Sequence, residues 1–198
     1  MSMVPAAGWK TAPAYSIAND EPDYYLNMGL TAEAVAKEFN VSRQQQDEFS
    51  YQSHQKAIRA IENGYFKSGI LPIPVEEIYL DEKNKRQKRS FVVDTDEGPR
   101  ADTSIEALTK LKPAFAAKGV ITAGNSSQTS DGAAFVLVMS ESMMKQLNVQ
   151  PIGRLVSSAV AGVHPRIMGI GPVAAIPKAL KMAGLNLNAI DLIELNEA

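Results

Sequence analysis

From Val120 onward, short apolar runs alternate with helix signals, and this alternation constrains the fold more than any other feature of the chain. The runs are rich in β-branched residues and predict strands. They cover residues 120–123, 133–139, 154–163 and 190–195. The second run could equally lead into a helix. Between them, Ser140 is placed to cap a short helix, and a helix over 172–183 has Pro at its start and Gly184 after its end. Strands that alternate with helices predict an α/β layer architecture.

Before this region, about 115 residues predict helices and loops, and together they look like a long insertion. Residues 8–26 are rich in Gly, Pro, Ala and Tyr without periodicity, so a loop is expected there. A short helix is expected over 31–39, with Thr31 as its cap. The clearest helix begins with a capping box at Ser42–Gln45 and ends before Gly64. Its apolar stripe consists of Phe49, Ala57, Ile58 and Ile61.

The insertion continues with two strands and a further short helix. The strands are expected over 70–80 and 90–93, on either side of a charged turn. A second capping box, Thr103–Glu106, predicts a helix that ends before Pro113.

Composition excludes several classes of protein. Twenty basic and 22 acidic residues give a net charge of 20 − 22 = −2, so nothing electrostatic favours nucleic acid or an anionic membrane as the main partner. No run approaches the ~18 apolar residues of a membrane span, and no secretory signal is visible. The chain has no cysteine, which removes disulfides, thiolate zinc sites and a cysteine nucleophile from these residues. With two histidines, a His-based metal site is not expected.

Both ends of the chain look like cuts through a longer protein. The first five residues run directly into Gly-, Ala- and Pro-rich sequence with no element to pack against. The last apolar run stops without the helix or loop that would follow a buried strand. A fragment is therefore expected.

Three segments rich in small or polar residues are candidate sites. Thr122–Ala133 sets small residues and backbone amides between apolar runs, which suits a closely approaching ligand, although a tight polar turn explains it equally well. Met168–Pro172 is a glycine turn at a helix start, which could hold an anion or carbonyl or simply permit close packing. Glu194–Glu197 follows an apolar run, where Asn196 could hold a water or donate to a carbonyl oxygen; a solvated strand end is the commoner case.

The remaining charged and imidazole groups are weaker candidates. Five cations lie within seven residues, at Lys83, Lys85, Arg86, Lys88 and Arg89. They could contact phosphate, but a solvated hairpin tip is favoured because nearby acidic residues partly cancel their charge. His54 is expected to be exposed on its helix, and His164 lies in a loop before Pro165, so neither is expected to be catalytic.

Seven segments in this order resemble one family, the thiolases, which cleave or form 3-ketoacyl-CoA. They are Met1–Pro5, Met28–Glu33, Asp96–Arg100, Lys110–Phe115, Thr122–Ala133, Met168–Pro172 and Asn196–Ala198. Any one of them would be weak, but the ordered set runs almost from end to end and is specific. The Asn125–Gln128 version of the central loop looks like the degradative, fatty-acid-oxidation branch more than the biosynthetic acetoacetyl-CoA branch.

The resemblance implies a thiolase-like layered α/β fold of two similar halves, with a helical and loop-rich domain inserted into the first. On that pattern, residues 1–4 end a first-half strand, 5–118 form the inserted loop domain, 119–149 complete the N-terminal half, and 150–198 begin the C-terminal half. The fold would be incomplete at both ends. The nucleophilic Cys would lie upstream, and a His and a second Cys, acting as base and acid, downstream.

The resemblance also implies roles for particular residues. Asn196, in an Asn-Glu-Ala motif, would fix a water that polarises the substrate thioester oxygen. The residues expected to contact coenzyme A are Ala123 and Ser127 along the pantetheine arm, Arg100 at the adenine and phosphate end, and Met28 and Phe115 beside the cofactor. One position departs from the biosynthetic pattern: Asn27 stands where those members often carry a CoA-binding His, in agreement with the degradative reading.

The activity implied for the parent enzyme is thiolytic cleavage of 3-ketoacyl-CoA through a Cys thioester, with CoA as substrate and no prosthetic group or metal. Acyl-CoA, CoA and a second copy of the chain, in a homodimer or homotetramer, are the expected partners. The location would be cytoplasmic in a bacterium. A biosynthetic acetoacetyl-CoA thiolase, a non-catalytic CoA- or lipid-binding relative and a structural scaffold remain alternatives. Residues 1–198 alone are expected to be inactive, since they contain no cysteine.

Overall fold

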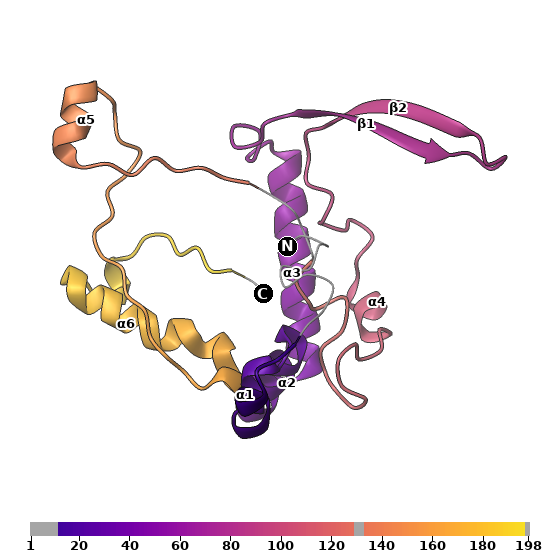
Figure 1. Ribbon diagram of the computed structural model, residues 1–198, viewed down its shortest axis with the longest axis horizontal. Coiled ribbons are helices and arrows are strands. Elements are labelled where there is room, and N and C mark those ends of the chain that lie inside the picture. The colour runs from indigo at the N-terminus through magenta and orange to yellow at the C-terminus, as the bar shows by residue number, and fades with distance from the viewer. Residues whose placement is uncertain (1–11, 129–132, 197–198) are drawn as a thin grey trace. The chain divides into compact units, whose positions relative to one another are not determined.

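The computed structural model (Figure 1) describes residues 12–128 and 133–196. The contacts within the chain divide it into two units. The first unit combines the residues up to Val41, Pro113–Ile121 and the residues from Ser126 onward. The second combines Ser42–Lys112 and Thr122–Asn125. Expectations for residues 1–11, 129–132 and 197–198, including the strand end at 1–4, lie outside the described residues.

The longest helix of the second unit, α3 (Arg43–Glu62), begins where its capping box predicts. The Ser42 hydroxyl accepts a hydrogen bond from the Gln45 backbone N–H at 3.2 Å, and the Gln45 side chain accepts one from the Ser42 N–H at 2.8 Å. After the helix, Gly64 has a φ of +72°, which favours glycine. The expected apolar stripe is only partly buried, because Phe49 is exposed and Ala57, Ile58 and Ile61 are half-buried. The buried side chain of α3 is a carboxylate, Asp47.

Strands β1 (Ile73–Leu80) and β2 (Arg86–Val93) form the predicted antiparallel hairpin (Figure 1). Strand β1 starts three residues later and β2 four residues earlier than predicted, so Arg86, Lys88 and Arg89 lie in β2 and not at the tip of the hairpin. Lys88 and Arg89, two of the five clustered cations, pair with carboxylates of β1 at 2.6 Å each. All four side chains of these pairs are well exposed, which agrees with a solvated charged hairpin.

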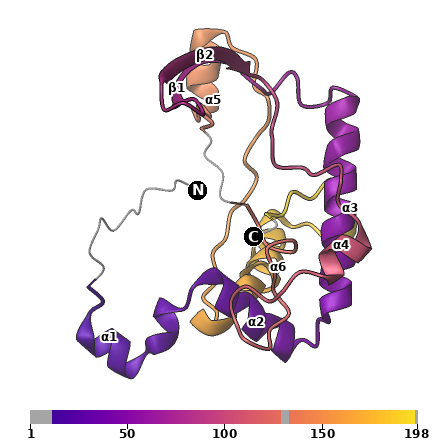
Figure 2. The same cartoon turned by 90° about the vertical axis from the view of Figure 1, so that its right-hand side faces the viewer.

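The short helix α4 (Ile105–Thr109) lies against α3 in the same unit (Figure 2). Its cap is Ser104, whose hydroxyl accepts the Ala107 N–H at 3.1 Å. The predicted cap, Thr103, was wrong by one residue, because Ser104 has the extended backbone that lets its side chain turn back onto the first turn.

The first unit is built from short helices. They are α1 (Tyr15–Asp20), the 3-10 turn η1 (Pro22–Tyr25), α2 (Met28–Glu38), α5 (Glu141–Leu147), η2 (Pro165–Ile170), α6 (Gly171–Ala183) and η3 (Leu187–Ala189). The loop predicted over 8–26 is therefore helical from Tyr15 to Tyr25, apart from Glu21. Helix α2 starts three residues earlier than predicted, because Asn27 rather than Thr31 is the cap and accepts the Leu30 N–H at 2.9 Å.

The runs predicted as strands after residue 119 form no strand in the described part of the chain. Most apolar side chains of the later runs are open to solvent, with Phe135 97% and Val160 92% exposed, whereas Ile121 in the first run is buried. A strand needs a neighbour to accept and donate its backbone hydrogen bonds. The first run makes only an isolated bridge, in which the Ala114 N–H donates to the Ile121 carbonyl at 2.9 Å, and the sheet of the described residues consists of β1 and β2. Local sequence thus predicted extended backbone but not its pairing.

Candidate functional site

The central loop opens with a turn over Thr122–Asn125 that is closed by its own side chains. The Asn125 side-chain oxygen accepts the Thr122 backbone N–H at 2.7 Å, and the Thr122 hydroxyl accepts the Gly124 N–H at 3.2 Å. Thr122 is fully buried, whereas Ala123, one of the predicted CoA-binding residues, is exposed at the top of the turn. The turn therefore exposes the small side chain of Ala123 and adjacent backbone, while the buried Thr122 and the hydrogen bonds of Asn125 fix its conformation.

An ion pair on α3, between the buried Asp47 and the partly buried Arg43, anchors this turn. The Arg43 Nε lies 2.7 Å from Asp47 Oδ2 and 2.9 Å from Oδ1, and the Asn125 amide nitrogen donates to Asp47 Oδ1 at 3.1 Å. The Arg43 Nη2 also donates to the backbone carbonyls of Leu108 at 2.6 Å and Leu111 at 3.1 Å. One arginine thus joins α3 to the end of α4 and neutralises the carboxylate that holds the turn.

Gly124 brings the turn into close contact with α4. A Cβ atom at this position would lie 2.5 Å from a methyl carbon of Leu108 and 2.5 Å from one of Leu111. Contacts this short do not occur between carbon atoms, so a side chain at residue 124 would require the two leucine side chains or the turn to shift.

In the first unit, the predicted residues Met28 and Phe115 lie close together. Met28 begins α2, and the Phe115 ring packs directly against the next residue, Gly29, where a Cβ atom would overlap the ring. Both side chains remain partly exposed, at 48% for Met28 and 42% for Phe115. An apolar ring and a flexible thioether at one accessible surface suit contact with an organic ligand.

Glu33 of α2 fixes the strand-like segment that leads into the central loop. Its carboxylate accepts the Val120 N–H at 3.1 and 3.0 Å, through its two oxygens, and the Ile121 N–H at 3.0 Å. Gly119 permits this approach, since a Cβ there would collide with the carboxylate. No sequence pattern indicates this bond, which joins residues 87 positions apart.

Arg100 lies in the second unit and is already engaged. Its guanidinium donates to Asp102 at 3.2 and 3.0 Å, and its backbone N–H donates to His54 Nδ1 at 3.1 Å. The hydrogen bond from Arg100, followed by its charge, holds the pKa of the Asp102 carboxyl group below its ordinary value. His54 is thus a hydrogen-bond partner of the Arg100 backbone in this unit.

The two remaining predicted residues, Ser127 and Asn196, are both exposed. The Ser127 hydroxyl donates to the Gln128 carbonyl at 3.3 Å. Asn196 is the last residue described, and Glu197 and Ala198 of its motif lie outside the described residues, as do Thr129–Gly132 of the central loop.

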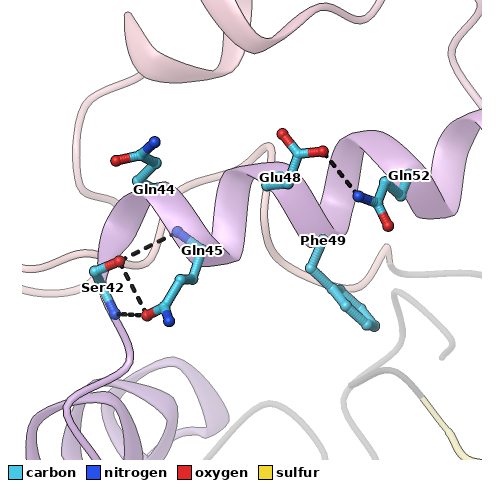
Figure 3. A pocket seen from close by; sticks show the side chains of 6 residues that line it. All are labelled: Ser42, Gln44, Gln45, Glu48, Phe49 and Gln52. Carbon is cyan, nitrogen blue, oxygen red and sulfur yellow. Dashed lines mark hydrogen bonds between the residues drawn. The ribbon is translucent and has the colours of Figure 1, made fainter.

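A surface hollow lies on α3 (Figure 3) and is lined by Ser42, Gln44, Gln45, Glu48, Phe49 and Gln52. It is open to solvent, and it contains the helix cap and a Glu48–Gln52 hydrogen bond of 2.8 Å. It includes none of the predicted site residues. Residues 12–128 and 133–196 contain no cluster of His, Asp and Glu suited to a metal ion. None of their helices is long and apolar enough to cross a bilayer.

Comparison with known proteins places these features in a family. The family profile for the thiolase N-terminal domain matches residues 16–142, and that for the thiolase C-terminal domain matches residues 149–198. The chain therefore belongs to the thiolase family. Its fold is accordingly that of an incomplete α/β thiolase-like fragment.

Individual members of the family are similar to this chain in sequence and in structure. The chain is 49% identical to a 3-ketoacyl-CoA thiolase of Bacillus subtilis over all 198 residues, which are 51% of that protein. It superposes on the crystal structure of a Bacillus anthracis acetyl-CoA acetyltransferase with a TM-score of 0.79 at 38% identity, over 100% of this chain and 49% of that one. For the dimeric peroxisomal thiolase of Saccharomyces cerevisiae the TM-score is 0.80 at 38% identity, over 98% and 46%. The chain spans about half the length of the relatives it matches.

Proposed function

We propose that the protein carrying this chain is a thiolase that cleaves 3-ketoacyl-CoA with CoA to give acetyl-CoA and a shortened acyl-CoA. The observation that carries the proposal is the 49% identity to a 3-ketoacyl-CoA thiolase along the whole chain. The Asn125–Gln128 loop and Asn27 support the degradative direction. Cytoplasmic location follows if the source is bacterial, although peroxisomal relatives at 50% identity leave the organelle open.

The proposed reaction passes through a thioester on a cysteine supplied from outside these residues. The cysteine thiolate attacks the C3 carbonyl carbon, the C2–C3 bond breaks, and its electron pair takes up a proton as acetyl-CoA leaves. The thiolate of a second CoA then attacks the acyl thioester and frees the cysteine. The role proposed for Asn196 is to hold a water against the substrate thioester oxygen, where negative charge develops.

The residues described above would bind CoA. Ala123 and Ser127 would lie along the pantetheine arm, because small side chains let the ligand rest against backbone. Met28 and Phe115 would offer the accessible apolar surface. Arg100 would meet the phosphates of CoA, which would compete with Asp102 for its guanidinium.

Within this proposal, the domains follow the thiolase pattern: 5–118 is the inserted loop domain, 119–149 belongs to the N-terminal half and 150–198 to the C-terminal half. The second copy of the chain is the proposed protein partner, since a solved relative is described as dimeric.

A second candidate is acetyl-CoA acetyltransferase activity, the name carried by a Pseudomonas aeruginosa relative with 49% identity. The test is to assay the complete protein with acetoacetyl-CoA and longer 3-ketoacyl-CoA substrates in both directions. Faster cleavage of the longer substrates supports the first proposal. Activity confined to acetoacetyl-CoA supports the second, and no acyl transfer with any substrate contradicts both.

A further inference from the structure

Helix α3 carries a buried carboxylate, Asp47, whose burial is not explained by packing of the helix alone. Asp47 is 2% exposed, and burying a carboxylate is unfavourable unless charge and hydrogen bonds compensate it. Arg43 supplies the charge from one turn earlier, and Asn125 supplies a hydrogen bond from the central loop. An apolar residue would fill a helix interface more simply. The carboxylate is therefore matched to the amide that it holds.

That amide fixes the shape of the turn as well as its place. The nitrogen of the Asn125 side chain donates to Asp47, which leaves its oxygen facing the Thr122 N–H at 2.7 Å. The amide nitrogen donates and the amide oxygen accepts, so the bond to Asp47 selects the orientation of the Asn125 side chain in which its oxygen closes the turn. Ala123 lies inside the segment closed in this way.

Arg43 extends the same control to α4. Its guanidinium reaches the carbonyls of Leu108 and Leu111, the two residues against which Gly124 packs. A single planar group therefore fixes both the carboxylate that holds the turn and the helix that supports it.

We propose that Arg43 and Asp47 are positioning residues for the pantetheine arm of CoA, acting through Asn125 on the turn that carries Ala123. This inference rests on the proposed function, since it takes CoA as the ligand. Neither residue needs to touch the ligand. Loss of the ion pair would let the turn open, and the turn would then have to be reordered before CoA could bind.

The test compares single variants of the complete protein with a variant that restores the interaction. Asp47→Asn and Asn125→Asp each remove the match between carboxylate and amide. We expect each to raise the KM for CoA about tenfold while kcat changes by less than about threefold. The double variant, Asp47→Asn with Asn125→Asp, exchanges the two groups and should recover part of the loss, because the amide now on α3 would donate to the carboxylate now in the turn. Glu48→Gln, which alters an exposed carboxylate one residue from Asp47, is the matched control.

Thermal melts separate positioning from simple stability. All kinetics are measured at a temperature where each variant is folded by circular dichroism, so a purely structural role lowers the melting temperature but leaves the KM unchanged. A KM within twofold of wild type in both single variants overturns the inference. If Asp47→Asn does not fold, Arg43→Lys keeps the positive charge but loses the planar fork, and the same rise in KM is expected.

Direct CoA binding, measured by calorimetry, distinguishes this inference from the proposed function. A wild-type protein that binds CoA without acyl transfer contradicts the proposed function, and the dissociation constants of the variants then test the positioning. Normal acyl transfer with unchanged variant KM values contradicts the positioning alone. Failure of wild type both to bind CoA and to transfer an acyl group contradicts both.

Discussion

The Arg100–Asp102 pair, at the scale of single residues, makes a prediction about pH. Arg100 lowers the pKa of Asp102, so the folded protein binds this proton less tightly than the unfolded chain. The pair therefore stabilises the fold at neutral pH, and its contribution is lost as the pH falls through the lowered pKa. We expect Arg100→Gln to return the pKa of Asp102 toward its ordinary value, as followed by NMR titration of the carboxyl carbon.

Asp81 provides the internal control for that titration. Its pKa is also lowered, first by the side chain of Gln87 and then by backbone N–H groups in the hairpin turn. It should titrate identically in wild type and Arg100→Gln. A pKa for Asp102 that is also unchanged would show that Arg100 is not its partner in solution.

Gly124 makes a prediction about packing. A methyl group there would meet methyl carbons of Leu108 and Leu111 at 2.5 Å, so Gly124→Ala must shift these two side chains, the turn or α4. We expect a loss of about 1–3 kcal/mol in the free energy of unfolding. Urea denaturation of the complete protein measures it. Gly69→Ala is the matched control, because its nearest neighbour would be the Phe66 carbonyl oxygen at 3.7 Å, an ordinary contact. Equal stabilities for the two variants would contradict the close approach.

The central loop could be found from sequence, but the residues that hold it could not. Thr122–Ala133 stands out because it concentrates small and polar residues between apolar runs. Arg43 and Asp47 have the i, i+4 spacing of an ordinary ion pair on an exposed helix face, which is what such a pair usually is. Their further partners lie 65 to 78 residues away along the chain, so only the folded structure reveals them.

At the scale of secondary-structure elements, the capping box of α3 makes a prediction about stability. Ser42→Ala removes the hydroxyl that accepts the Gln45 N–H and leaves that donor without its cap. We expect the free energy of unfolding to fall by roughly 0.5–2 kcal/mol. Ser42→Asp retains an acceptor at the same place and should recover most of the loss. If Ser42→Ala and wild type unfold at the same urea concentration, the capping bond contributes nothing.

Local signals predicted α3, α6 and the hairpin well but misplaced the caps of α2 and α4, and the strands that need distant partners did not form among the described residues. The start of α3 and the end of α6 follow from a capping box and from Gly184, whose φ is +68°. The hairpin follows from two runs that are close in sequence. The extended runs at 133–139 and 154–163 have strand composition, yet pairing depends on a neighbour that local sequence does not specify.

At the scale of the whole chain, the exposed apolar runs predict how residues 1–198 behave alone. Phe135 to Val138 are each at least 80% exposed, and such a run is prone to associate. We expect the isolated chain to have no thiolase activity, to bind a hydrophobic dye and to sediment as aggregates. Val136→Lys with Val138→Lys should reduce the aggregation without creating activity. A monomer with a sharp cooperative melt would contradict the packing prediction, and turnover above background would contradict the need for a cysteine.

The contacts of Arg43 also have a consequence for the order of folding. Bringing Asp47 to Asn125 directly closes a loop of 78 residues, which is entropically unfavourable. Once Arg43 has bound the carbonyl of Leu111, only about 14 residues separate Leu111 from Asn125. Bringing Asn125 to Asp47 then costs about 1.5 kcal/mol less in loop-closure entropy than closing the 78-residue loop directly. Docking of α4 on α3 should therefore precede formation of the turn in the central loop. In a refolding experiment, Arg43→Ala would slow folding, whereas Asn125→Ala would chiefly speed unfolding.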